Sequence, residues 1–473
     1  MKLLLAILAA TLALSAQPVF TDVFPPEEYA ARRARVMEKI GDAVAIMQGT
    51  TERPGEQPLR QSNQFFYVTG VVEPRAILTI DGRSHRTVLY LNPRVERRET
   101  MMFGPGLYPG PEAAASTGID EVLARADFAK AVETFAADHR VIFTNFRPEV
   151  LGSASSSDPA TLARNTRADP WDGRISREEA FIAKLRAAAP GSEVRDLDPI
   201  VDMLRGAKSP REIAILREAT RIAGLGIMEA MRDCRPGMRQ YELQADAEFV
   251  FKKHGAYGAA YFALIGSGKT TFYTHYHKNT ATIDNGDLVQ FDYAPDYKNY
   301  ASDVTRVFPA NGKFTARQRE YYGIYLKLYQ SLMTSIRVHA APRDIIKDAV
   351  VKMDAIMATY PFTDDHIKQA AVKFVETYRN SKANSLGHTV GMEVHDVRNP
   401  TPTLEPGQLF TIEPEMQIPE EHVGIRLEDM LLITETGYEN LSAFVPIEMD
   451  DIEKLMKEPG LSDPRAPLKG PKK

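Results

Sequence analysis

Apolar positions follow different spacings in the two parts of the chain, and the change falls near residue 200. The first part opens with an Arg-rich amphipathic helix at 29–39. Short apolar runs typical of strands follow it, at 43–48, 76–81, 87–92 and 140–144. Helices mixed with short buried strands predict an α/β domain in this part.

Long amphipathic helices dominate the second part. Ser209 before Pro210 is typical of a helix start, because Ser caps the first turn and Pro fits the first helical position. Further helices are predicted at 240–254, 316–339, 342–360 and 363–378. Short strands lie between and after these helices, so the whole chain is predicted to be α+β.

A hairpin predicted around residues 288–308 carries two acids. Asp292 interrupts one apolar strand and Asp303 interrupts the next. A turn centred between Tyr297 and Lys298 places the two Asp residues directly opposite. Like charges about 5 Å apart across a sheet destabilise it, so the pattern predicts a cation between them.

A second predicted hairpin repeats this arrangement. Glu413 and Glu428 flank the turn sequence 419–421, and a centre between Glu420 and Glu421 places the two outer acids face to face. Two such pairs in one chain are a stronger signal than either pair alone. The sequence therefore predicts a metal site built from four carboxylates.

Two histidines lie between the hairpins. His388 has Gly387 and Gly391 beside it, which allow the backbone to approach a site closely. His395 follows, but a separation of seven residues does not by itself place both on one metal. Four carboxylates with one imidazole suit Mn²⁺ and also accept Co²⁺, Zn²⁺ or Fe²⁺. Two divalent ions bridged by shared carboxylates activate water at neutral pH, which is hydrolytic chemistry.

Each of these residues alone has an ordinary explanation. A strand Asp or Glu is usually a surface residue, and a lone His is most often a satisfied polar group. Two carboxylate pairs in phase, together with a glycine-flanked histidine, favour a metal site over these explanations.

The length and charge of the chain restrict its class. With 473 residues it exceeds the roughly 250 to 300 at which single cores stop growing, so two domains are expected. The formal net charge of -5, without a basic cluster, excludes nucleic acid as a predicted partner. Cys234 is the only cysteine, so no intrachain disulfide is possible, and we expect a packed thiol rather than a nucleophile.

The chain ends predict export. An apolar run at 3–14 before Ser15-Ala16 is typical of a signal peptide over residues 1–16. The run is shorter than the roughly 20 residues that span a bilayer, so a periplasmic or secreted protein without a membrane anchor is expected. The tail 458–473 is rich in Pro, Gly and Lys and is predicted to be disordered. An exposed, mobile excursion is predicted at 153–174.

One motif imitates a phosphate-binding loop. Residues 266–270 read Gly-Ser-Gly-Lys-Thr, but that loop also requires glycine five residues before Gly268, where this chain has Ala263. No nucleotide site is predicted.

The residues so far resemble the pita-bread metallopeptidases, and within them the aminopeptidase P and prolidase group. The resemblance spans nearly all of the chain after the signal peptide. It implies a dinuclear metal centre, Mn²⁺ in the first place with Co²⁺ or Zn²⁺ as alternatives, bound by Asp292, Asp303, His388, Glu413 and Glu428.

The same resemblance implies roles for residues outside the ligand set. His275, after Gly266-Ser267-Gly268, matches a histidine on the substrate side, and His395 matches a second one. Arg426 matches the Arg two residues before the last ligand, which orients a ligand carboxylate. Glu413 would also carry the proton toward the leaving nitrogen.

Residues 60–70, with Glu73-Pro74 shortly after, resemble aminopeptidase P in particular. This implies a creatinase-like α/β domain at 17–197 and a pita-bread catalytic domain at 198–457. Such N-terminal domains help to form dimers or tetramers, so a homo-oligomer is expected.

The implied activity is release of the N-terminal residue from peptides with proline at position two. A prolidase acting on Xaa-Pro dipeptides is the alternative within enzymes. A creatinase-like metal-free hydrolase and a metal-free peptide- or protein-binding module remain further alternatives, although neither needs five intact ligands. Two departures bear on substrate preference: Glu415 replaces the usual glycine after Glu413-Pro414, and Asn384 stands where many relatives have histidine.

Overall fold

A computed structural model describes residues 20–52, 58–150, 152, 155, 157–398 and 401–461. The predicted signal peptide lies outside these residues, as does the predicted tail from residue 462 onward. The start of that tail is packed, since Glu458 pairs with Arg232 at 3.0 Å. The chain divides into two compact units, Met1–Gly152 with Pro159–Leu204 and Ser153–Asp158 with Arg205–Lys473.

The first unit is built on a six-stranded mixed sheet in the order β4-β3-β2-β1-β5-β6. Strands β1, β2 and β3 pair antiparallel, whereas β4, β5 and β6 join in parallel. All four strand predictions in this part are confirmed. The strands are β1 (Val44–Gln48), β2 (Ile77–Asp81), β3 (Arg86–Leu91), β4 (Glu121–Ala124), β5 (Ile142–Thr144) and β6 (Val194–Asp196).

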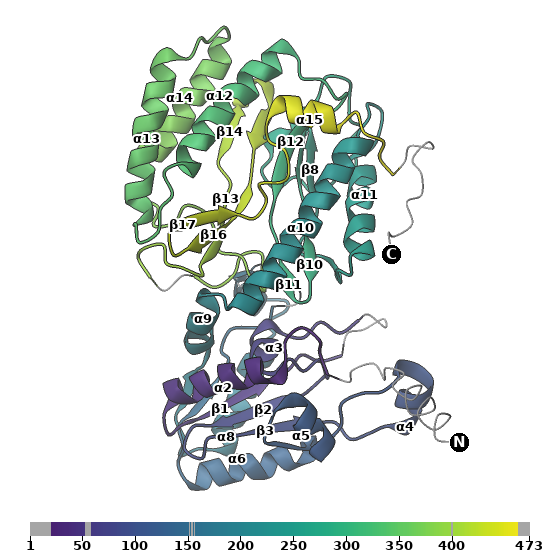
Figure 1. Cartoon of the computed structure of the whole chain (residues 1–473). Coiled ribbons are helices and arrows are strands. Elements are labelled where there is room, and N and C mark those ends of the chain that lie inside the picture. Colours follow the sequence, from purple (N-terminus) through teal and green to yellow (C-terminus); the bar gives the residue numbers. More distant parts are fainter. Residues whose placement is uncertain are drawn as a thin grey trace, which may run out of the picture. The chain divides into compact units, whose positions relative to one another are not determined.

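Helices cover both faces of this sheet (Figure 1). On one face, Val132 and Leu185 from two helices pack against Val44 and Ile46 of β1. The predicted first helix is confirmed and lies on the opposite side. The main helices are α2 (Pro26–Ile40), α3 (Asn63–Thr69), α5 (Pro111–Thr117), α6 (Phe128–Ala137), α8 (Arg177–Ala188) and α9 (Asp198–Gly206), with the short α4 (Glu96–Arg98).

The predicted excursion at 153–174 is largely exposed, as expected, but much of it is helical rather than a loop. Residues Ser157–Ala168 form helix α7. The polar Ser run predicted a loop, but it serves to start this helix: the side chain of Ser155 accepts from the backbone of Ser157 at 3.3 Å. Residues 153, 154 and 156 lie outside the described part.

The second unit places its strands between two groups of helices (Figure 1). Helix α10 begins with the predicted cap, since Ser209 and Glu212 form a reciprocal capping box. Helix α12 ends at Met333 rather than near His339, which has a φ of 60°. The helices are α10 (Pro210–Asp233) and α11 (Gln240–Lys253) on one side, α12 (Ala316–Met333), α13 (Pro342–Thr359) and α14 (Asp365–Arg379) on the other, and α15 (Met449–Leu455).

The strands of this unit form several small sheets. A backbone bridge between Thr305 and Glu428 connects two of them. The sheets are β12-β9-β8, β13-β16-β17, β11-β10-β7 and β14-β15. Their strands are β7 (Gly258–Ala259), β8 (Leu264–Ser267), β9 (Leu288–Asp292), β10 (Pro295–Tyr297), β11 (Tyr300–Ala301), β12 (Thr305–Pro309), β13 (Leu409–Ile412), β14 (Glu415–Ile418), β15 (Val423–Arg426), β16 (Asp429–Thr434) and β17 (Gly437–Asn440).

The predicted register of the first hairpin is wrong by two residues. Asp292 pairs with Thr305, not with Asp303. The turn is centred on Lys298 and Asn299, whose φ angles of 54° and 69° are those of a two-residue type I′ turn. A shift of two residues keeps both Asp side chains on one face, so they remain diagonal neighbours.

The predicted register of the second hairpin is confirmed. Ile418 pairs with Val423 and Glu415 pairs with Arg426, which centres the turn between Glu420 and Glu421. Glu413 and Glu428 lie just beyond the paired residues of this hairpin.

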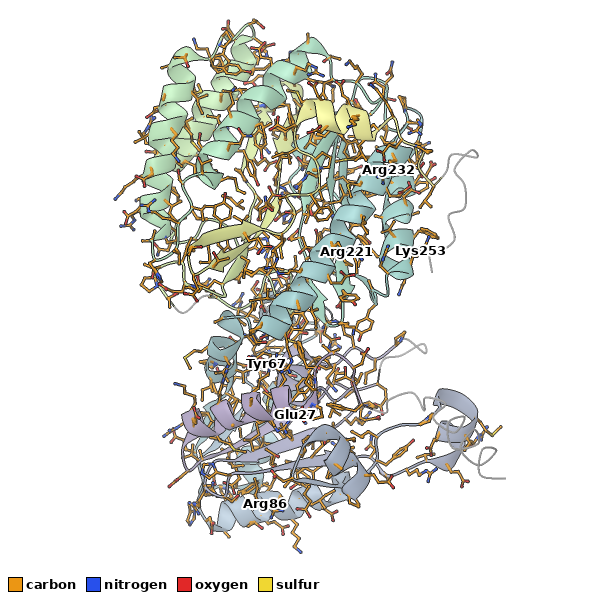
Figure 2. The ribbon with its side chains drawn as sticks, viewed as in Figure 1. Glu27, Tyr67, Arg86, Arg221, Arg232 and Lys253 are labelled. Atoms are coloured by element: carbon orange, nitrogen blue, oxygen red, sulfur yellow. The ribbon has the colours of Figure 1, made fainter. Side chains whose placement is uncertain are left out.

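The surface of the second unit carries paired rather than clustered cations. Arg221 contacts Glu218 at 2.7 Å, and Arg232 contacts Glu229 at 3.4 Å, both on the outside of α10 (Figure 2). In the described part of the chain, no helix is both long and apolar enough to cross a membrane. Cys234 is buried, and burial raises the pKa of its thiol to about 12, as expected for a packed cysteine.

Candidate metal centre

Five predicted ligands come together in the second unit, at the ends of strands from different sheets. Asp292 closes β9, Asp303 precedes β12, and Glu428 follows β15. These three side chains are 3%, 5% and 1% exposed. Glu413, after β13, is 31% exposed and so remains reachable from outside.

His388 is at the centre of this group. Its Nε2 lies 3.4 Å from Asp303 Oδ2, 3.4 Å from Glu413 Oε1 and 3.7 Å from Glu428 Oε1. One ligand atom each from Asp303, His388 and Glu428 lie within 4.8 Å of one another. One cation can therefore contact all three residues.

Tyr261 and Arg426 hold the Asp residues. The Tyr261 hydroxyl donates to Asp292 Oδ1 and to Asp303 Oδ1, each at 2.6 Å. The guanidinium of Arg426 donates to Asp292 Oδ2 and lies 3.7 Å from Glu413. Sequence reasoning missed Tyr261, because no local pattern connects it with strands that follow about 30 residues later.

The four carboxylates form a cluster with raised proton affinity. Burial raises the pKa of Asp292 to about 6, against the opposing effect of Arg426. Burial and the neighbouring Glu428 raise the pKa of Glu413 to about 7. The pKa values of Asp303 and Glu428 are also raised, first by burial.

The neighbouring carboxylates also raise the pKa of His388. Burial disfavours its charged form, yet Asp303 and Glu428 raise its pKa to about 11. The buried Glu428 Oε1 accepts no hydrogen bond from any described residue. Closely spaced oxygen ligands with raised proton affinity are the donor set that divalent cations stabilise. The residues present therefore fit the metal ions that the sequence predicted.

His395 lies beside this cluster. Its ring centroid is 4.1 Å from that of His388. Burial, with the charges of His388 and His275, lowers the pKa of His395 to about 4, so its imidazole is neutral at physiological pH. A neutral imidazole carries one N–H donor and one acceptor nitrogen, which suits a contact with substrate.

A buried ion network supports the His395 segment. Asp396 accepts from Lys208 Nζ at 2.7 Å and also pairs with Arg205. Arg205 in turn contacts Glu393 at 3.0 Å. Ser155 forms an isolated backbone bridge with His395. Sequence reasoning did not identify these positions.

His275 is on the open side of the centre. It is exposed, and the carbonyl of its neighbour Thr274 accepts from Arg426 Nη1 at 3.4 Å. This contact brings the His275 segment to Arg426 and, through it, to Asp292. The ring of His277 packs against Phe262 instead, at 4.9 Å between centroids.

Residues 266–270, whose sequence is similar to part of a phosphate-binding loop, do not form such a loop. Gly268 begins a five-residue 3-10 helix, and a side chain there would collide with Asp287 at 2.5 Å. A carboxylate in this place would repel phosphate. The absence of a nucleotide site stays a prediction.

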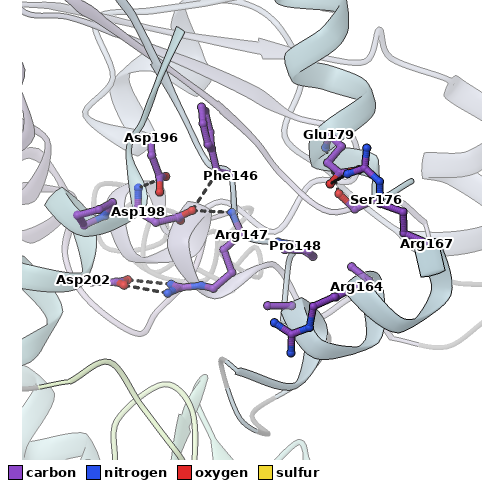
Figure 3. A pocket seen from close by; sticks show the side chains of 13 residues that line it. Phe146, Arg147, Pro148, Arg164, Arg167, Ser176, Glu179, Asp196, Asp198 and Asp202 are labelled. Atoms are coloured by element: carbon purple, nitrogen blue, oxygen red, sulfur yellow. Dashed lines mark hydrogen bonds and ion pairs between the residues drawn. The ribbon is translucent and has the colours of Figure 1, made fainter. Parts of the chain in front are cut away.

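The first unit contains a separate cavity of about 570 Å³ (Figure 3). Its charged groups largely pair with one another. Arg147 makes two contacts of 2.8 Å with Asp202, and Arg167 contacts Glu179 at 2.7 Å. It contains no histidine and none of the predicted ligands.

Comparisons with known proteins agree with this organisation. Residues 214–435 match the model of metallopeptidase family M24, and residues 29–143 match the aminopeptidase P N-terminal domain. The Xaa-Pro aminopeptidase of Escherichia coli is 32% identical over 462 residues, covering 91% of this chain and 97% of the relative. The Xaa-Pro aminopeptidase of Haemophilus influenzae is 30% identical over 455 residues, with the same coverage.

Solved structures of aminopeptidases P have the same fold as this chain. Aminopeptidase P from E. coli, with the inhibitor Pro-Leu, superimposes with a TM-score of 0.72 at 29% identity, covering 92% of this chain and 98% of that one. A proline aminopeptidase from Yersinia pestis gives 0.71 at 30% identity, covering 92% and 100%. The two matched domains, the α+β fold and the carboxylate cluster agree: this chain belongs to the aminopeptidase P family, with an M24 pita-bread metallopeptidase domain.

Proposed function

We propose that this metallo-aminopeptidase uses two divalent metal ions to release the N-terminal residue from peptides with proline at position two. The observation that carries this proposal is the group of Asp303, His388 and Glu428, with Glu413 in contact with His388 and Asp292 joined to Asp303 through Tyr261. The names of the relatives support the substrate class.

The five ligands would hold the ions. Bound there, two divalent cations supply an activated water at neutral pH and polarise a carbonyl oxygen. The oxygen-rich donor set favours Mn²⁺ with Co²⁺ or Zn²⁺ as alternatives. One E. coli aminopeptidase P structure is described as zinc-substituted.

Glu413 is the proton carrier in this proposal. A general base works best with a pKa near the working pH, and in the metal-free chain that of Glu413 is raised to about 7. It is also the most exposed of the four carboxylates, so a substrate can reach it. Glu413 can therefore accept a proton from the attacking water and deliver it to the leaving nitrogen.

The remaining site residues orient these groups. Arg426 fixes Asp292 by a buried hydrogen bond. His395, neutral and inside the site, can donate to the oxygen that becomes negative during attack. His275, on the exposed side, is placed to contact the substrate.

A dipeptidase of the prolidase type is the second candidate. It would share the metal centre but would recognise a free carboxylate after proline. A metal-free binding module is disfavoured, because four carboxylates with raised proton affinity around one histidine are costly without a cation.

We also propose that the chain is exported after removal of residues 1–16 and acts as a dimer or tetramer. The apolar N-terminal run supports export, and the match to the aminopeptidase P N-terminal domain supports self-association.

One experiment separates the enzymatic candidates. Metal-reconstituted protein lacking residues 1–16 is offered an Xaa-Pro dipeptide and an Xaa-Pro-Xaa tripeptide, and products are identified by mass spectrometry. Release of the first residue from the tripeptide supports the proposal. Cleavage of the dipeptide alone identifies a prolidase, and cleavage of neither refutes both.

A further inference from the structure

Glu415 is a carboxylate on the substrate side of the centre that the metal site does not require. We propose that Glu415 makes this enzyme prefer peptides that carry a Lys or Arg side chain beside the scissile bond. This inference rests on the proposed Xaa-Pro aminopeptidase activity.

The strand places Glu415 on the same side as Glu413. Residues 413, 415 and 417 are partly exposed, whereas Pro414, Met416 and Ile418 are buried. Alternate residues of an extended chain point to the same face. Glu415 therefore faces the open side, where Glu413 reaches His388 and where substrate must enter.

Neutral groups fix the Glu415 side chain. Its Oε2 accepts from Thr274 Oγ1 at 2.8 Å, and its Oε1 accepts from Gln417 Nε2 at 3.0 Å. Gln417 is held in turn by the backbone carbonyl of Phe272 at 2.9 Å. Both donors that orient the carboxylate are themselves uncharged.

No described cation pairs with Glu415. Arg426, its cross-strand partner, and His275 both interact with its charge, but the ion-pair contacts of that guanidinium are with Asp292 and Glu413. Bound divalent ions would balance the four ligand carboxylates, whereas Glu415 lies outside that set. An oriented, partly exposed carboxylate without an ion-pair partner attracts a cationic ligand group.

The surrounding residues fit a long basic side chain. Tyr273 is 55% exposed, and its ring stacks with Tyr276 at 6.5 Å between centroids. Both flank the segment that holds Glu415 through Thr274. Aromatic faces accept the stems and charged heads of Lys and Arg. The substrate α-amino group is the alternative partner of Glu415: since every aminopeptidase substrate has one, it would give no preference among peptides.

The test compares peptides that differ only in charge. Met-Pro-Ala is the neutral reference, Lys-Pro-Ala places the charge before the scissile bond, and Met-Pro-Lys places it after. We expect the metal-loaded wild-type enzyme to show a higher kcat/KM for one or both basic peptides, by about threefold or more. E415Q keeps the size and acceptor oxygen but removes the charge. The ratio of kcat/KM for a basic peptide to kcat/KM for Met-Pro-Ala should therefore fall to near one. The preference should also weaken at high salt.

E420Q is the matched control, since Glu420 is an exposed carboxylate at the turn of the same hairpin. It should keep the wild-type ratio. A wild-type enzyme without basic preference, or an E415Q variant that retains it, overturns the role of Glu415. If the wild type cleaves none of the three peptides, the proposed function itself fails, which is a different result from cleavage without preference.

Discussion

The imidazole rings of His388 and His395 lie 4.1 Å apart between centroids, although they are seven residues apart in the chain. The intervening loop is closed at its base: Asp396 N donates to Thr389 O at 2.9 Å, and Thr389 Oγ1 donates back to Asp396 O at 3.0 Å. Of the two rings, only that of His388 makes ion-pair contacts with the ligand carboxylates among the described residues. Closeness of the two rings therefore does not make both of them ligands.

His395→Ala should retain metal and lose rate. The ring contributes no carboxylate contact but lies where substrate oxygen must approach, so kcat should fall by about a hundredfold. Metal content by mass spectrometry and steady-state kinetics check this together. Loss of metal instead would place His395 among the ligands.

Asp303→Ala should abolish both bound metal and turnover. The carboxylate contacts His388 and receives the Tyr261 hydroxyl, so its removal opens the ligand set. The first unit should remain folded, with its β-sheet signal unchanged by circular dichroism. Glu420→Gln, at an exposed turn, should keep full metal content. Full activity of Asp303→Ala would refute the site.

Metal affinity should fall as pH falls from about 7 to about 5. In the metal-free protein, the raised pKa values of Asp292, about 6, and Glu413, about 7, mean that both carry protons over part of this range. A metal ion must displace these protons and that of His388, whose pKa is raised to about 11, so acid competes with it, and binding near pH 6 should release about two to three protons. Calorimetry in two buffers of different ionisation enthalpy measures the release. An affinity that is constant between pH 5 and 7 would contradict the raised pKa values.

Asp396→Ala should destabilise the second unit. It leaves Lys208 and Arg205 buried with one carboxylate fewer, and breaking a buried ion pair costs about 3–5 kcal/mol. The midpoint of guanidinium unfolding measures the change. Asp354→Ala removes an exposed ion pair with Arg379 and should cost less than about 1 kcal/mol. Equal effects of the two substitutions would contradict the importance of burial.

Local patterns predicted most elements and one hairpin register. The cap at Ser209 fixed the start of α10, and the turn at Glu420 and Glu421 fixed the pairing of Glu415 with Arg426. The predicted register of the other hairpin was wrong because its turn depends on positive φ angles at Lys298 and Asn299. A lysine in the sequence does not indicate a positive φ. The prediction that both Asp side chains lie on one face of the sheet was still correct, since a shift of two residues does not change the face.

Long-range contacts could not be predicted in the same way. The Tyr261 hydroxyl reaches two ligands, and Arg205 reaches Asp396, but these residues belong to separate elements. Only the folded chain brings them together. Helix α7 was missed because its Ser-rich start is also typical of loops.

Thr305 and Glu428 exchange backbone hydrogen bonds of 3.1 and 3.4 Å, and the Thr305 hydroxyl donates to the Glu428 carboxylate at 2.8 Å. These two residues are 123 positions apart. Contacts between such distant residues form slowly, because a long loop must close first. During synthesis, a ribosome-bound chain that ends before residue 428 has the Asp pair but not the last ligand. Retention of metal should therefore show that synthesis and folding have passed residue 428, and chains terminated before that residue should be recognisable by their failure to retain metal.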